Sequence, residues 1–212
     1  MKEKPSLLII GNSNVGKSSI TRLLLPHPSK FKGKAGKKPG STLLIRPITQ
    51  PGLKYQIVDL PGFGYMKSSS KRREEHVKRQ IVVHVEKHHA KYFLALIVIN
   101  VLRIEDELVK YNLMRKDTIP LSFELINFIS EFHIPHLILF NKIDKLSKRD
   151  SVRVLNFFIE QAREHGIQLI HLNDHDFEKK GVVPYLEFSA LKKINIRKLK
   201  WMIEECWKRR KI

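Results

Sequence analysis

Residues 11–18, Gly11-Asn12-Ser13-Asn14-Val15-Gly16-Lys17-Ser18, match the pattern G-x-x-x-x-G-K-[ST] at every fixed position. The pattern follows the apolar run Leu7–Ile10 and precedes residues with helical periodicity, so it is predicted to join a strand to a helix. Glycines let such a loop approach phosphate closely, and the N–H groups of the helix N-terminus point at anionic oxygens. We therefore predict a phosphate-binding loop that extends to Ser19. In it, Lys17 supplies a point charge to the terminal phosphates and the Ser18 hydroxyl ligates Mg²⁺.

A second element with an acidic residue lies downstream, where the apolar strand pattern before position 59 ends in Asp59-Leu60-Pro61-Gly62. A carboxylate at the carboxyl end of a strand can hold Mg²⁺ directly or through water. The backbone N–H of Gly62 can donate to a γ-phosphate. A lone D-x-x-G pattern occurs often by chance, but its position after a phosphate-binding loop favours a role in the same site.

A third element predicts which base is bound. The apolar strand pattern Leu137–Phe140 runs into Asn141-Lys142-Ile143-Asp144, an N-K-x-D sequence. The Asp144 carboxylate can accept two hydrogen bonds from guanine, from N1–H and the exocyclic amine, and adenine lacks this donor pair. Asn141 is expected to tether the loops around the base, and the Lys142 stem to cover its face.

A fourth element, Phe188-Ser189-Ala190, ends another strand pattern, and its backbone N–H groups can meet the guanine O6. Serine followed by alanine means little alone, but here it comes last in the order of motifs found in small GTPases. Parallel α/β sheets bind ligands at the carboxyl ends of their strands, so we expect all four elements to meet there.

The elements that must position these residues alternate between short apolar strands and longer helical patterns. This alternation predicts an α/β fold of three layers, with a mostly parallel six-stranded sheet and helices on both faces. We expect residues 1–212 to form a single domain, with residues 103–120 and 171–183 as surface excursions. Strands are predicted over Leu7–Ile10, Leu43–Ile48, Lys54–Leu60, Tyr92–Val101, His136–Asn141 and Tyr185–Ser189. Helices are predicted over Ser18–Leu25, Arg72–His89, Ile119–Phe132, Val152–His165 and Ile194–Arg209.

The charge of the chain indicates a polyanionic partner. Lys and Arg number 40 against 21 Asp and Glu, for a formal net charge of +19. Such an excess attracts nucleic acid or an RNA-rich particle. An acidic membrane surface, or no polyanionic partner at all, remains an alternative. With its single cysteine, Cys206, the chain cannot build a disulfide framework. Its apolar runs are too short for a membrane span or a secretory signal, so we expect a cytoplasmic protein.

In their details, the motifs resemble those of the EngB family of ribosome-biogenesis GTPases, which are TRAFAC-class P-loop proteins, and in particular its archaeal branch. Members carry S-N-V-G-K-S, K-x-P-G-x-T and D-x-P-G-[FY]-G-[FY], which stand here at residues 13–18, 37–42 and 59–65. The resemblance covers nearly the whole chain. It implies a GTPase needed for assembly of the large ribosomal subunit, with GTP or GDP, Mg²⁺ and K⁺ as ligands. Its implied partners are the subunit precursor and its rRNA. We expect a monomer, because no segment is typical of a dimer interface.

The resemblance also implies roles for particular residues. Thr42, in the segment Pro39-Gly40-Ser41-Thr42, would reach Mg²⁺ and the γ-phosphate, and Asn14 would be the asparagine of potassium-stimulated relatives. The residue after Gly62 is Phe63, not the glutamine that positions water in Ras-like enzymes. Hydrolysis is therefore expected to be slow until K⁺ or a ribosomal element completes the site. The implied metal ligands are Ser18, Thr42 and Asp59, and the implied catalytic residues are Lys17, Thr42, Gly62 and Asn14.

Two departures from the family pattern are Asn12, where relatives often have arginine, and Asn100, where many have aspartate. Two other functions stay open, an RNA-binding module that keeps GTP or GDP as a structural ligand and a P-loop GTPase that acts on tRNA, a membrane or metal homeostasis. The basic segments 30–38, 71–73 and 207–211 are equally consistent with rRNA contacts and with solvated surface. His84 and His88 have the spacing of a metal-binding pair but are expected to be solvated, and Trp201 is expected to pack in the core.

Overall fold

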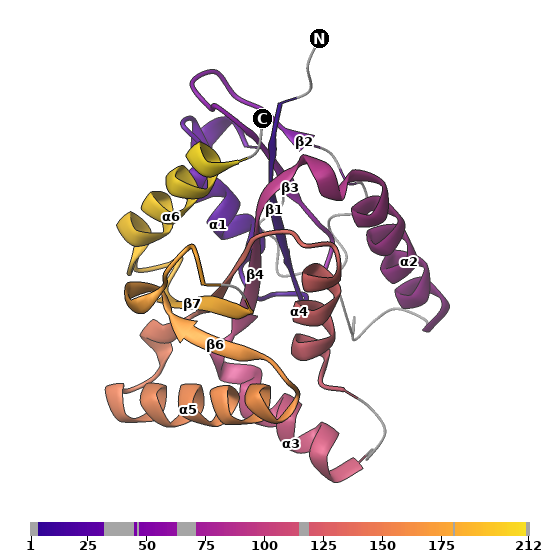
Figure 1. Ribbon diagram of the computed structural model, residues 1–212, viewed down its shortest axis with the longest axis vertical. Helices are drawn as coiled ribbons and strands as arrows, with labels where there is room; N and C mark the ends of the chain where they lie inside the picture. Colours follow the sequence, from indigo (N-terminus) through magenta and orange to yellow (C-terminus); the bar gives the residue numbers. More distant parts are fainter. Residues whose placement is uncertain are drawn as a thin grey trace.

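The computed structural model describes residues 4–31, 45, 47–62, 71–114, 119–179 and 181–210, with the backbone alone for 71–74 and 112–114. Its strands form one sheet in the order β2-β3-β1-β4-β5-β7-β6, in which β2 runs antiparallel to β3 and all other pairs are parallel (Figure 1). The strands are β1 Ser6–Gly11, β2 Pro47–Ile48, β3 Gln56–Asp59, β4 Tyr92–Asn100, β5 His136–Asn141, β6 Gln168–His171 and β7 Val182–Phe188. The helices are α1 Lys17–Leu24, α2 Lys71–His88, α3 Ile104–Met114, α4 Leu121–Glu131, α5 Lys148–Glu164 and α6 Ile196–Arg209.

Helices cover both faces of the sheet, as the sequence predicts for this α/β fold. Alternate residues of β1 point to opposite faces, so that Leu8 lies in one apolar cluster and Leu7 in the other. The first cluster includes Ile81 of α2 and Phe123 of α4, together with side chains of α3 and α5. The second cluster is closed by α1 and α6, which lie together on the left in Figure 1. The two clusters hold the sheet as the rigid middle layer.

The register of the parallel strands brings the ends of the predicted motifs to one edge. Asn141 at the end of β5 pairs with Asn100 of β4 on one side and with Phe188 of β7 on the other. On the far side of β4, Gly11 at the end of β1 pairs with Val98. The phosphate-binding loop, the N-K-x-D sequence and residues 188–190 therefore all follow the carboxyl ends of neighbouring strands.

The sheet differs from the prediction in strand number, since seven strands lie in the described residues rather than six. The additional strand, β6, pairs only with β7, and its residues Gln168–His171 are exposed or half-buried. An edge strand this short lacks the continuous apolar run by which the central strands are recognised. β7 also begins at Val182, earlier than predicted. Of the predicted strand Leu43–Ile48, only Pro47–Ile48 is a strand, Ile45 is not, and the other positions lie outside the described residues.

The helices agree with the prediction in number except for α3, which lies inside the expected excursion 103–120. It is not a surface excursion throughout, because Ile104 and Leu108 are buried in the core. α5 begins at Lys148 rather than Val152, because Ser147 caps it by accepting a hydrogen bond from the Asp150 N–H at 3.1 Å. α6 begins at Ile196, since Ile194 instead forms a bridge with Ser189.

Trp201 corrects another expectation. Its neighbours Leu199, Met202 and Ile203 lie on the buried face of α6, whereas the Trp201 side chain is 51% exposed. His84 is half-buried and accepts or donates a 2.8 Å hydrogen bond at the Tyr92 hydroxyl, so it is not simply solvated. Among the described residues no group of three or more potential metal ligands gathers. None of the described helices combines the length and apolar character needed to cross a bilayer.

Candidate nucleotide-binding site

The phosphate-binding loop leaves β1 and enters α1, as predicted. Lys17 at the start of α1 reaches back over the loop, and its Nζ donates to the carbonyl oxygens of Gly11 and Asn12, both at 2.8 Å. The side chain is only 8% exposed, and this burial lowers the pKa of Lys17 to about 8, against the opposing attraction of Asp59. A phosphate bound in the loop would raise the pKa of Lys17, because its negative charge would favour the charged ammonium.

Gly16 is required by the way the loop packs against the base-side loop. It has φ +107°, in the left-handed region, and a Cβ built on it would lie 2.3 Å from Asn141 Nδ2. The same approach lets Asn141 Nδ2 donate to the Val15 carbonyl oxygen at 2.7 Å. A side chain at position 16 would thus separate the two loops, in addition to straining the backbone.

Asp59 and Ser18 meet beside Lys17. The Ser18 hydroxyl donates to Asp59 Oδ2 at 3.0 Å, so β3 and the start of α1 are joined at this point. Asp59 is 7% exposed, and burial raises the pKa of its carboxyl despite the nearby ammonium of Lys17. Its second oxygen, Oδ1, is buried with no hydrogen-bond partner among the described residues. Two oxygens of the types that Mg²⁺ prefers therefore lie together at the edge of the phosphate-binding loop.

Gly62 follows β3 and packs directly on the phosphate-binding loop. A Cβ built on Gly62 would lie 2.2 Å from Ser13 Oγ and 2.8 Å from the Ser13 N and Cα atoms. Because two of these atoms belong to the backbone, no rotation of the serine side chain could make room. The structure thus brings the D-x-P-G element against the loop, with Leu60 and Pro61 buried between β3 and this contact.

Asn141 joins the phosphate side of the site to the base side. While its Nδ2 donates to Val15, its Oδ1 accepts the Ala190 N–H at 3.0 Å. Lys142 makes a parallel link, with its Nζ donating to the Asn14 carbonyl oxygen at 2.8 Å. The predicted tether is thus present as a set of bonds between segments more than 100 residues apart.

Asp144 is held in place by Ser189, whose hydroxyl donates to Asp144 Oδ1 at 2.6 Å. The same hydroxyl oxygen accepts the Lys192 N–H at 2.9 Å, which fixes the loop after β7. Ser189 is fully buried, so its hydroxyl direction is set by these two bonds. Ile143 begins a short 3-10 turn with Asp144, after Lys142 with φ +71°. The carboxylate and the N–H groups of residues 189–190 are thus brought to the same loop cluster.

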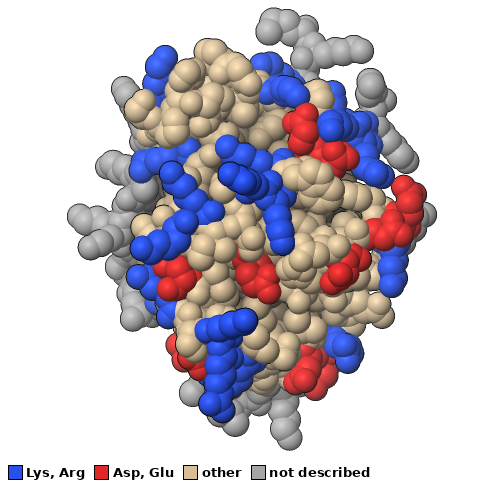
Figure 2. All heavy atoms as spheres, turned by 90° about the vertical axis from the view of Figure 1, so that its left-hand side faces the viewer, with Lys and Arg blue, Asp and Glu red and all other residues tan. Residues whose placement is uncertain are grey.

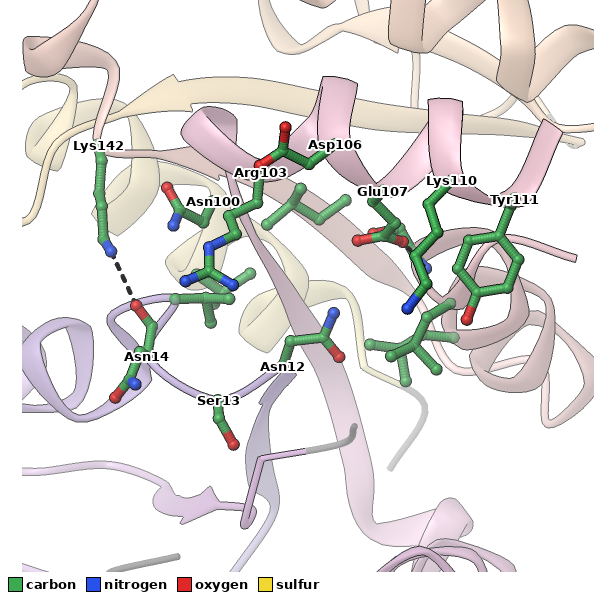
Figure 3. A pocket seen from close by; sticks show the side chains of 16 residues that line it. Asn12, Ser13, Asn14, Asn100, Arg103, Asp106, Glu107, Lys110, Tyr111 and Lys142 are labelled. Atoms are coloured by element: carbon green, nitrogen blue, oxygen red, sulfur yellow. Dashed lines mark hydrogen bonds between the residues drawn. The ribbon is translucent and has the colours of Figure 1, made fainter. Parts of the chain in front are cut away.

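A pocket of about 300 Å³ lies beside the phosphate-binding loop, with the loop as one wall and α3 as another (Figure 3). Figure 3 shows Asn12 pointing toward α3 and Ser13 pointing away from it. The sequence analysis missed the α3 side of this pocket, because its side chains have no motif spacing. That side and the adjoining end of β4 contribute Asn100, Arg103, Asp106, Glu107, Lys110 and Tyr111.

Glu107 shows that the α3 wall is built into the fold. Its Oε1 accepts the backbone N–H of Ser122 at the start of α4, at 2.7 Å. Burial raises the pKa of Glu107, although this hydrogen bond opposes the shift. The Asn100 side-chain oxygen accepts the N–H of Leu102, so Asn100 caps the turn that leads into α3. Asn12 and Asn100, the two departures from the family pattern, therefore both line this pocket.

Several predicted site residues lie outside the described residues. They are Pro39, Gly40, Ser41 and Thr42. Phe63, which is not a predicted site residue, also lies outside the described residues. The predicted role of Thr42 as a metal ligand stays a prediction. The role of the lysine-rich segment 30–38 in rRNA contact also stays a prediction, because most of that segment lies outside the described residues. The remaining predicted site residues, from Gly11 to Ser19, 59–62, 141–144 and 188–190, gather at the carboxyl edge of the sheet.

Comparison with protein families and curated proteins gives consistent similarities. A family model described as "50S ribosome-binding GTPase" matches residues 6–142. The "Probable GTP-binding protein EngB" of Methanococcus aeolicus is 33% identical over 156 residues, which are 74% of this chain and 65% of that protein. The protein of the same name from Pyrococcus abyssi is 30% identical over 156 residues, which are 74% of this chain and 69% of that protein. The chain thus spans about two thirds of the length of these relatives.

Comparison with solved structures gives the same similarity in three dimensions. The crystal structure of a probable GTP-binding protein EngB superposes with a TM-score of 0.72 at 27% sequence identity. The match covers 95% of this chain and 97% of that chain. The two chains therefore share one fold over nearly their whole lengths.

Proposed function

We propose, from the fact that this chain belongs to the EngB family of GTP-binding proteins, that it binds guanine nucleotides with Mg²⁺, hydrolyses GTP and acts in assembly of the large ribosomal subunit. The observation that carries the proposal is the double hydrogen bonding of Asn141, to Val15 in the phosphate-binding loop and to Ala190 in the base-side loop. A single nucleotide placed across these loops would meet Lys17 with its phosphates and Asp144 with its base.

The donor set near Lys17 fits a magnesium ion. Asp59 Oδ1 is a buried carboxylate oxygen without a described partner, and Ser18 Oγ lies 3.0 Å from the other oxygen of the same carboxylate. We propose that these two residues hold Mg²⁺, with Thr42 as the further ligand that the family resemblance implies. When bound, Mg²⁺ would neutralise charge on the β- and γ-phosphates. It would also favour the ionised carboxylate of Asp59, against the desolvation that raises the pKa of this group.

Hydrolysis in this site would depend on positioning and charge. Lys17 would stabilise negative charge on the phosphates, and the Gly62 N–H would donate to the γ-phosphate. The residue that follows Gly62 in the sequence is Phe63, which cannot position water as a glutamine would. Asn14 has φ +63° and offers its carbonyl oxygen to Lys142. We propose that its side chain holds K⁺, which would place a further positive charge beside the phosphates.

Single-turnover GTP hydrolysis by the isolated protein is expected to be about 10- to 100-fold faster in potassium than in sodium, because a fitted cation stabilises developing charge. The variant Asn14→Gly should lose this difference and keep its GDP affinity. Glycine adopts the left-handed backbone of position 14 without strain, so the comparison isolates the side chain. Equal rates in the two salts with no ribosome present would contradict the potassium proposal.

The ribosomal partner is supported by the family description and by charge. The chain carries a formal charge of +19, and a surface of this sign attracts rRNA at distances set by the salt concentration. We propose that the protein acts in the cytoplasm as a monomer of one domain, which binds the precursor with GTP and leaves after hydrolysis.

Co-sedimentation with purified large-subunit precursors tests this proposal. We expect binding with a non-hydrolysable GTP analogue to exceed binding with GDP by about tenfold or more, since a coupling free energy of 1–3 kcal/mol is typical of such switches. Mature small subunits serve as the matched RNA-rich control. Equal binding with both nucleotides would favour an RNA-binding module with a structural nucleotide. Binding to tRNA or to vesicles in preference to the precursors, or binding to neither ribosomal particle, would indicate that the GTPase acts on another target.

A further inference from the structure

We propose that the outer face of α6 binds single-stranded RNA, with the Trp201 ring stacked on an unpaired base and the cations Arg197 and Lys200 on the phosphates. This surface is called the α6 platform below. It names a contact for the ribosomal partner and therefore rests on the function proposed above.

The first observation is the position of Trp201 on α6. The apolar side of this helix is buried through Leu199, Met202 and Ile203, so the helix is anchored on the sheet. Trp201 points the other way and is 51% exposed. An amphipathic helix needs no tryptophan on its solvent side for folding, because the ring gains little burial there.

The second observation is that the ring of Trp201 is supported by neighbouring aromatic groups. Its centroid lies 6.2 Å from that of Phe177 at an interplanar angle of 63°, so the two rings meet edge to face and are not stacked. Phe177 is itself fixed between His175, at 4.9 Å, and the guanidinium of Arg209, 4.5 Å above its ring. A ring held this way presents a surface for stacking at a lower cost in side-chain entropy.

The third observation is the charge around the ring. Arg197 and Lys200 are exposed, and neither makes an ion pair with a residue that the structure describes. The two acidic residues of the helix are already neutralised, Glu204 by Lys54 at 2.8 Å and Glu205 by Lys208 at 2.9 Å. Figure 2 looks at the side of the molecule that carries α6, and Lys and Arg side chains gather over its upper and middle parts.

Acidic residues limit the path that a strand can take. The loop that carries Phe177 also contains Asp174, Asp176 and Glu178, of which Glu178 lies 3.4 Å from Arg209. The phosphates should therefore follow the cations of α6 rather than this loop. An exposed aromatic ring beside unpaired cations is the combination by which single strands are bound, since every base has a face that can stack. A duplex keeps its bases stacked on one another and offers no such face.

The experiment uses the full chain with labelled 12-nucleotide strands of uridine or adenosine. Fluorescence anisotropy should show that Trp201→Ala weakens binding about 5- to 100-fold, the usual range for removal of one stacked base contact, whereas Trp201→Phe keeps most of the affinity. In the Trp207→Phe background, fluorescence then comes from Trp201 and should be quenched by either strand. Val152→Ala removes another exposed apolar side chain, on α5, and should leave the affinity unchanged.

A matched pair of charge reversals separates specific contacts from general attraction. Arg197→Glu with Lys200→Glu should weaken binding and lower the slope of log K against log salt by about 1.4, for two phosphate contacts on a single strand. Lys148→Glu with Arg149→Glu makes the same change in net charge on α5, at exposed positions, and should have a smaller effect. GDP binding by each variant shows that it remains folded.

Three results would overturn the inference. These are unchanged affinity of Trp201→Ala, equal losses from the two charge reversals, and binding of ribosomal proteins through Trp201 without binding of the strands. Failure of the strands to bind while nucleotide-dependent co-sedimentation persists would refute the α6 platform alone. If the unchanged protein showed no nucleotide-dependent co-sedimentation but still bound the strands through Trp201, the proposed function would be refuted. The α6 platform would then remain an RNA-binding surface.

Discussion

Asp144→Asn is expected to abolish the preference for GDP over ADP and to lower GDP affinity by roughly 100- to 10,000-fold. The estimate follows from the loss of two charge-assisted hydrogen bonds, each contributing about 1.5–3 kcal/mol. Ser189 holds the Asp144 carboxylate from one side at 2.6 Å, so the carboxylate is already oriented before a base arrives. The measurement is a titration of the purified variant with fluorescent GDP and ADP.

Xanthosine diphosphate makes the experiment a test of mechanism as well as of affinity. Xanthine has a carbonyl group where guanine has the exocyclic amine, so an asparagine amide can donate to it. We expect Asp144→Asn to bind xanthosine diphosphate more tightly than the unchanged protein does. Asp174→Asn makes the same charge change at an exposed position and should leave all three affinities unaltered. If Asp144→Asn still selected GDP, the N-K-x-D sequence would not be the guanine reader.

Lys17→Ala is expected to lower GDP affinity at least about 100-fold while the protein remains folded. The Lys17 ammonium donates to two backbone carbonyl oxygens at 2.8 Å and lies where the glycine-rich loop would cradle phosphate. Because the ammonium is buried, its attraction to a bound phosphate is only weakly screened by water. Fluorescent GDP titration measures the affinity, and circular dichroism with thermal melting measures the fold.

Two further variants show whether position or charge is responsible. Lys17→Arg keeps the positive charge but brings a larger planar group into a site that leaves the native side chain 8% exposed, so it should lose affinity as well. Lys87→Ala removes an exposed lysine of α2 and should bind GDP like the unchanged protein. Retention of GDP affinity by a folded Lys17→Ala protein would exclude residues 11–18 as the phosphate-binding loop.

The local motifs and the alternation of strands and helices could be predicted from the sequence. Each phosphate-binding or base-reading residue lies at a spacing that one backbone segment imposes, as Gly16, Lys17 and Ser18 do at the start of α1. Central strands such as β4 and β5 are continuous apolar runs, because they are covered on both faces. The short edge strand β6 was missed for the opposite reason, since it lacks such a run and depends on pairing with β7.

What the tertiary structure decided is how these segments meet. No spacing along the chain predicts that Asn141 would contact both Val15 and Ala190, or that α3 would form a wall beside Asn12, because these contacts depend on sheet register and helix packing. The same holds for Trp201. Its apolar ring led to the prediction of a core residue, but the face that α6 buries is formed by Leu199, Met202 and Ile203, and Trp201 lies on the opposite side of the helix. Sequence determines the chemistry of a segment and its local conformation, whereas burial and contacts between distant segments arise only when the layers pack.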